Sequence, residues 1–88
     1  MTFKELKFRT WQVNGLGGQP DIQARTEING FDVSVVRNGL SYGGKKGLYE
    51  MGLFDEGGMC DPLGWGDTVK GWLRPQDVDQ IFEELKAL

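Results

Sequence analysis

The sequence contains no histidine and a single cysteine, Cys60. Histidine is the most frequent general base and zinc ligand, so its absence removes every Ser-His and Cys-His catalytic arrangement. One cysteine excludes an internal disulfide and fits a reducing compartment. The acidic residues around Cys60 would raise the pKa of the thiol and leave it a poor nucleophile. We therefore expect a protein that is not an enzyme, with no catalytic, metal-binding or cofactor-binding residues.

Long apolar runs are also missing. The longest contain only a few residues, far below the roughly 18 that a membrane-spanning helix requires. The first ten residues, MTFKELKFRT, lack the apolar segment of a signal peptide. These features predict a cytoplasmic location and no membrane contact. The 88 residues suffice for one domain, residues 1–88, with one modest core.

Glycine, in contrast, is abundant, with 14 residues that predict many turns and short elements. Asn29-Gly30 is the strongest of these signals, because a type I′ hairpin turn needs positive φ at both central positions. Before it, residues 22–28 read as a polar strand at the edge of a sheet. After it, apolar residues alternate with polar ones from Phe31 to Val35, which predicts a strand with one buried face.

Three further segments complete the expected elements before the C-terminal helix. Residues 3–13 could form a strand, although their alternation is imperfect, and residues 14–21 form a loop. Residues 48–54 read as a strand that places Tyr49, Met51 and Leu53 on one face. Residues 67–72 are expected to form a short helical turn.

The C-terminal segment has the pattern of an amphipathic helix over residues 75–87. Pro75 suits the first helical position, where its missing N–H costs nothing. Apolar residues then recur at helical spacing and form one stripe: Val78, Ile81, Phe82, Leu85 and Leu88. Arg74 would be the N-cap, where it is less favourable than Ser, Thr or Asp by roughly 1 kcal/mol.

Together these elements predict an α+β fold. Three or four antiparallel strands would pack one face of their sheet against the C-terminal helix. The expected core consists of the inward-facing strand residues and the helix stripe: Phe31, Val33, Val35, Tyr49, Met51, Leu53, Val78, Ile81, Phe82 and Leu85.

Residues 39–46, GLSYGGKK, match most of the phosphate-loop template G-x-x-x-x-G-K-[ST]. The template ends in Ser or Thr, which holds magnesium, but here the last residue is Lys46. The loop should also open a helix, whereas a strand-like run follows. We interpret the segment as a hairpin tip that presents Tyr42, Lys45 and Lys46 to solvent.

Trp65 and Trp72 lie in a glycine-rich segment before the helix. Such residues usually cover the open side of a small core. If exposed, they would be natural contacts for a partner, because aromatic residues carry much of the energy of protein interfaces. The candidate partner contacts are therefore Tyr42, Lys45, Lys46, Trp65 and Trp72.

Charge is unevenly distributed along the chain. Residues 1–46 contain seven basic residues against four acids, and residues 47–88 contain nine acids against three bases. This asymmetry can mark a binding surface, although two solvated faces would also explain it. The net charge of −3 opposes nucleic-acid binding, which normally uses a basic footprint. The acidic half could instead bind a basic protein surface.

The order of motifs DVSVVRN, SYGG, GLYEMGLF, CDP, DTVKGWL and PQDVDQIFEEL resembles that of small uncharacterised proteins encoded by tailed bacteriophages and prophages. The resemblance covers about residues 29–88, and residues 1–22 have no counterpart. This chain departs from the pattern at Gly64-Trp65-Gly66 and at Arg74. The resemblance implies a short sheet with one helix, and a bacterial host cell as the site of expression. It supplies no catalytic residues.

The function that we expect is that of a non-enzymatic, phage- or prophage-encoded accessory protein that binds a host or phage protein. Inhibition of a host or defence factor would be one form of this activity. The first alternative is a structural or assembly protein that forms homo-oligomers. A small-ligand or nucleotide binder that uses residues 39–46 ranks behind both.

Overall fold

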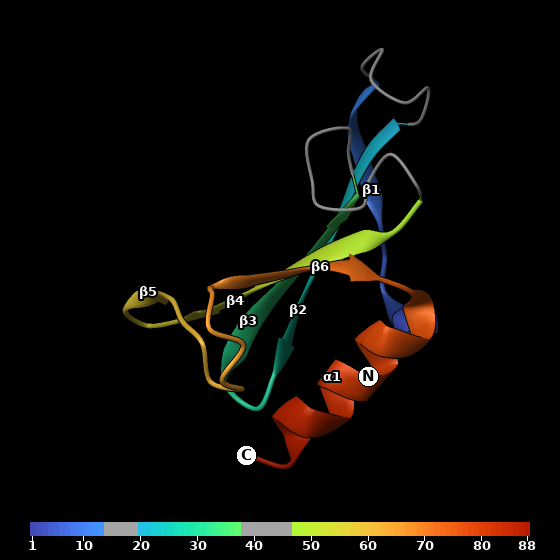
Figure 1. Ribbon diagram of the computed structural model, residues 1–88. Coiled ribbons are helices and arrows are strands. Elements are labelled where there is room, and N and C mark those ends of the chain that lie inside the picture. Colours follow the sequence, from blue (N-terminus) through green and yellow to red (C-terminus); the bar gives the residue numbers. More distant parts are fainter. Residues whose placement is uncertain (14–19, 38–46) are drawn as a thin grey trace.

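A computed structural model describes the backbone of residues 1–13, 20–37 and 47–88. The chain combines an antiparallel sheet with one C-terminal helix, which confirms the predicted α+β class (Figure 1). The elements are η1 (Phe3–Glu5), β1 (Arg9–Val13), β2 (Pro20–Ile28), β3 (Phe31–Arg37), β4 (Tyr49–Asp55), β5 (Gly58–Met59), β6 (Val69–Leu73) and α1 (Pro75–Lys86). In the described part of the chain the sheet has six strands, more than the three or four expected.

The β2–β3 hairpin forms as predicted. Asn29 and Gly30 both have positive φ, 52° and 86°, as a type I′ turn requires. The Asn29 side-chain amide donates hydrogen bonds to the backbone carbonyl oxygens of Leu85, at 3.0 Å, and Leu88, at 2.9 Å. The turn is therefore tied to the last turn of α1, and it fixes that end of the helix against the sheet.

The N-terminal segment differs from the prediction in two ways. Residues 3–13 do not form one strand, because η1 occupies Phe3–Glu5 and β1 begins at Arg9. The Phe3 N–H donates to Asp79 Oδ1 on α1 at 2.6 Å, which holds η1 on the helix. In addition, β2 is not an edge strand, because β1 pairs with its outer side. The polar residues of β2 reflect one exposed face, not an exposed edge.

The segment expected to be a helical turn is also a strand. Residues Val69–Leu73 form β6, which pairs antiparallel with β4 on the side away from β3. Leu73 is buried in the core opposite Tyr49. The prediction was wrong because the irregular pair Gly71-Trp72 hides the alternation, and pairing with β4 decides the conformation.

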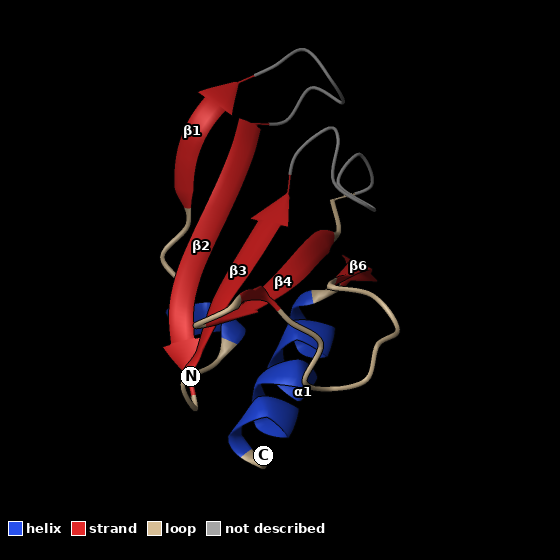
Figure 2. Cartoon of the chain, turned by 90° about the vertical axis from the view of Figure 1, so that its left-hand side faces the viewer, coloured by secondary structure: helices blue, strands red, loops and turns tan. Residues whose placement is uncertain are grey.

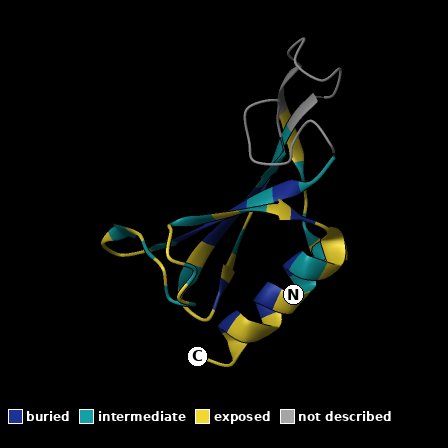
Figure 3. Cartoon of the chain, in the orientation of Figure 1, coloured by how far each residue is buried: buried dark blue, intermediate teal, exposed yellow. Residues whose placement is uncertain are grey.

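Helix α1 lies across one face of the sheet and packs its apolar stripe onto β3 and β4 (Figure 2). The predicted core is confirmed, with Phe31 only partly buried at its margin, and it also includes Ala24, Ile28 and Leu73 (Figure 3). Leu88, at the end of the predicted stripe, is exposed instead. Phe3 and Phe8 extend the core, with ring centroids 5.0 and 5.5 Å from that of Tyr49.

Arg74 precedes α1 as predicted, and Asp77 compensates for its weakness as an N-cap. One Asp77 carboxylate oxygen accepts the Arg74 backbone N–H at 2.9 Å and the guanidinium Nε–H at 3.0 Å. These hydrogen bonds lower the pKa of Asp77. Among the described residues, no helix has both the length and the apolarity that crossing a membrane would demand.

Candidate binding face

The strands of the sheet send alternate side chains to opposite faces. On β3 and β4, Val33, Val35, Met51 and Leu53 point toward α1 and are fully buried. No helix among the described residues covers the other face, which we call the open face. By strand register, the open face includes Lys7, Arg9, Gln23, Arg25, Glu27, Asp32, Ser34, Val36, Glu50, Gly52, Phe54 and Met59, and Trp72 lies at its β6 edge.

The half of the open face formed by β4, β5 and β6 carries a group of apolar side chains beside the half-buried Glu50. Phe54 on β4 stands opposite Met59 on β5. A Cβ atom at Gly52 would lie 3.6 Å from the Phe54 ring and 3.8 Å from the Met59 methyl group, so both side chains rest over this glycine. Met59 is nevertheless 49% exposed. A large, flexible apolar side chain is thus available beside an aromatic ring.

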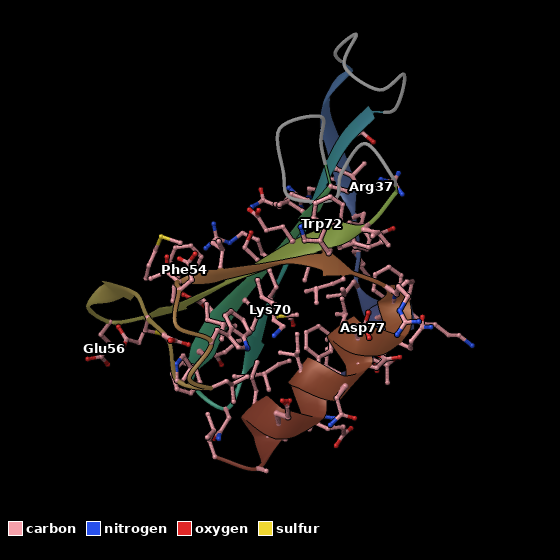
Figure 4. All side chains as sticks on the ribbon, in the orientation of Figure 1. Arg37, Phe54, Glu56, Lys70, Trp72 and Asp77 are labelled. Atoms are coloured by element: carbon pink, nitrogen blue, oxygen red, sulfur yellow. The ribbon has the colours of Figure 1, made fainter. Side chains whose placement is uncertain are left out.

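Trp72 lies in the same half, at an irregular point of β6. The register with β4 shifts between Tyr49 and Met51, so that Gly71 and Trp72 together stand opposite one residue. Trp72 has a φ of 59°, in the left-handed region, and the residue is 57% exposed. Figure 4 shows Trp72 and Phe54 on the side of the sheet away from α1.

The other half of the open face is basic. Lys7, Arg9, Gln23 and Arg25 line a hollow of about 480 Å³. The three cations have no ion-pair partner in the described part of the chain. Arg25 connects the two halves, because its guanidinium carbon lies 5.5 Å from the centroid of the Phe54 ring.

Gln23 and Ser34 form the polar floor between the two halves. The Gln23 side-chain amide donates to Ser34 Oγ at 2.8 Å, and Ser34 is the buried polar residue of the described sheet. This bond holds Gln23 in place beside Arg9, its cross-strand partner. The hollow is therefore shaped by a hydrogen-bonded amide as well as by exposed cationic side chains.

Acidic residues mark where the basic half of the open face ends. Glu27 and Asp32 are cross-strand partners and lie exposed toward the turn end of the open face. At the two ends of α1, two cations are already paired, Arg74 with Asp77 and Lys86 with Glu83. Three cations that have no ion-pair partner among the described residues, Lys7, Arg9 and Arg25, therefore gather at the β1 and β2 side of the open face.

The structure separates the sequence-predicted contacts. Tyr42, Lys45 and Lys46 lie in residues 38–46, outside the described residues. Trp65 is partly buried and packs against the core, as the more common interpretation expected. That interpretation is wrong for Trp72, which is exposed. Both tryptophans also line a second hollow, of about 580 Å³, between β6 and α1, so Trp72 at the sheet edge borders this hollow as well as the open face.

Several residues of the open face were missed by the sequence argument: Lys7, Arg9, Gln23, Arg25, Phe54 and Met59. The alternation in residues 22–28 already placed Gln23 and Arg25 on one face. The missing information was the pairing of β1 with β2, which brings Lys7 and Arg9 beside them.

The acidic segment after β4 serves to shape turns. Asp55 accepts the Gly57 N–H at 2.8 Å, and Asp61 accepts the N–H groups of Trp65 and Gly66. Within the described ranges, no three His, Cys, Asp or Glu side chains gather in a way that could hold a metal ion. Desolvation, followed by the nearby Asp55 carboxylate, raises the pKa of the Cys60 thiol. The predicted direction of that shift is confirmed.

Comparisons with protein-family models, with curated proteins and with solved structures found no significant match to this chain.

Proposed function

We propose that this chain is a non-enzymatic binding protein that docks a partner protein on the open face of its sheet. The observation that carries the proposal is Trp72, which combines a left-handed backbone with a mostly exposed indole ring. A bulky residue in that backbone region costs roughly 1–3 kcal/mol, and such strain concentrates at functional sites. Glycine would avoid this cost at the same position.

The surroundings of Trp72 support a binding role. Exposed tryptophan, methionine and arginine are enriched at protein interfaces, and tryptophan and arginine dominate the energy of binding. The open face contains all three types, in Trp72, Met59 and Arg25. The absence of histidine from the sequence also favours binding over acid–base catalysis.

The resemblance to phage-encoded proteins extends the proposal to the biological context. On that basis the partner is a protein of the bacterial host or of the phage, and the site of action is the host cytoplasm. Inhibition of a host or defence factor would follow if the open face covered a functional surface of that partner. This part of the proposal is supported by the motif order alone.

The test is affinity capture from bacterial lysate, with and without phage infection, followed by quantitative mass spectrometry. The tagged wild-type chain is compared with Trp72→Gly, which suits the left-handed backbone and removes the indole ring. Leu88→Ala is the matched control, because Leu88 is equally exposed, at 58% against 57%, but lies at the end of the chain beyond α1.

We expect a partner that is recovered with the wild type and with Leu88→Ala and is depleted with Trp72→Gly. Purified partner and chain should then form a complex in isothermal titration calorimetry. Equal recovery of every protein with all three baits would contradict the proposal.

A further inference from the structure

The basic hollow of the open face points to the chemistry of the partner. We infer that Lys7, Arg9 and Arg25, with Gln23, receive the carboxylate side chains of an acidic segment on the partner protein. This inference rests on the proposed function and adds the class of partner surface to it. It reverses the expectation from sequence that the acidic half of this chain binds a basic surface.

The first step of the argument is the state of the three cations. They converge on one hollow of about 480 Å³, and no described acid pairs with them. Three like charges placed together repel one another, so an anion that enters the hollow relieves this repulsion. Guanidinium groups also bind carboxylates through two parallel hydrogen bonds, which adds geometric specificity to the attraction.

The second step distinguishes a protein from a nucleic acid. A nucleic-acid strand carries a regular series of phosphates and needs a continuous basic track. Here the basic half ends at the exposed carboxylates of Glu27 and Asp32, and the β4 side of the open face combines the apolar Phe54 and Met59 with the acidic Glu50. The chain as a whole also carries a net charge of −3. A short acidic cluster next to apolar side chains matches this pattern better than a polyanion.

The third step is the connection between the two halves. The Arg25 guanidinium lies over the Phe54 ring, which holds it toward the middle of the open face. A carboxylate bound to Arg25 would bring the adjacent residues of its own chain over Phe54 and Met59. The fitting segment is therefore acidic with an apolar or aromatic residue among its carboxylates.

The test is a titration of the uniformly ¹⁵N-labelled full chain, followed by ¹H–¹⁵N correlation spectra. The probe is the blocked peptide Glu-Glu-Phe-Glu-Glu, and Gln-Gln-Phe-Gln-Gln is the uncharged control. Lys7→Glu removes one cation from the hollow. Lys4→Glu is its matched control, because Lys4 is also exposed and lies three residues away on η1, outside the hollow.

We expect the acidic peptide to shift the amide signals of Lys7, Arg9, Gln23 and Arg25, and the uncharged peptide to leave them in place. Lys7→Glu should raise the dissociation constant of the acidic peptide about tenfold, equivalent to ~1.4 kcal/mol of binding free energy, and Lys4→Glu should leave it unchanged. Added salt should weaken binding, because the charges at the hollow are partly solvated.

Two results would overturn the inference. If an oligothymidylate shifts the same signals at lower concentration than the acidic peptide, the hollow is a nucleic-acid site. If neither probe shifts them, the hollow does not bind anions. The capture experiment with Trp72→Gly is independent of these peptides, so a failure there would remove the proposed function and leave the anion site standing.

Discussion

The backbone of Trp72 leads to a prediction with an unusual sign. At an ordinary strand position, glycine is less stable than alanine because it loses more conformational freedom on folding. At position 72 the φ of 59° favours glycine. We therefore expect Trp72→Gly to be more stable than Trp72→Ala.

The expected difference follows from two opposing terms. A residue with a Cβ atom costs roughly 1–2 kcal/mol in the left-handed region, and glycine avoids this cost. Alanine gains about 0.4–1 kcal/mol over glycine because its unfolded chain has less entropy to lose. Both variants lose the same indole packing, so that contribution cancels. Trp72→Gly should be more stable than Trp72→Ala by roughly 0.8 kcal/mol, the difference between the midpoints of these two ranges.

Urea denaturation and thermal unfolding would measure this difference, which corresponds to about 2–8 °C in Tm for a domain of this size. Lys70 supplies the control, because it lies exposed on the same strand and does not have positive φ. There the order should reverse, with Lys70→Ala more stable than Lys70→Gly. If alanine is also the more stable residue at position 72, the strain argument for a functional Trp72 is refuted.

Three further predictions concern the helix, the turn and the cysteine. Asp77 has a lowered pKa because Arg74 donates hydrogen bonds to its carboxylate. The carboxylate therefore stabilises the fold above the ordinary aspartate pKa of about 3.9, and this stabilisation is lost as pH falls through the lower folded-state pKa. The Tm values of Asp77→Asn and of the wild type, measured against pH, should converge in acid. Asn29→Ala should lower the free energy of unfolding, measured by urea denaturation, by about 1–3 kcal/mol. Asn29→Gly should lower it less, because glycine keeps the turn and loses only the two hydrogen bonds to the end of α1. The raised thiol pKa of Cys60 should make its alkylation by iodoacetamide at neutral pH slower than that of free cysteine, and Asp55→Asn should accelerate it.

The elements that could be predicted from the sequence are those with a local signal. Asn29-Gly30 determines its turn through backbone sterics, and the stripe in residues 75–87 needs only one apolar partner surface. The alternation around Val33 and Met51 likewise identifies buried faces without knowledge of their neighbours. In each case a few consecutive residues contain the physical cause.

The elements that were missed depend on distant segments. Strand β6 exists because its backbone pairs with β4, and the bulge at Gly71-Trp72 obscures its alternation. The short η1 is held by Asp79, which lies 76 residues further along the chain. Residue patterns within one window do not contain such information, because the partner that satisfies each segment is chosen by the folded topology.

The binding face illustrates the same limit for function. Read along the chain, charge divides into a basic first half and an acidic second half, which suggested a basic hairpin tip as the contact. The fold instead gathers basic side chains of the β1 and β2 region on the open face, which also carries Glu27, Asp32 and Glu50. Strand pairing brings Lys7 and Arg9 beside Arg25 on the open face, while α1 presents its acids on the opposite side. The chain therefore presents a local positive region although its net charge is negative. The acidic segment of a partner must be short enough to fit the hollow without extending over Glu27 and Asp32, whose carboxylates would repel it.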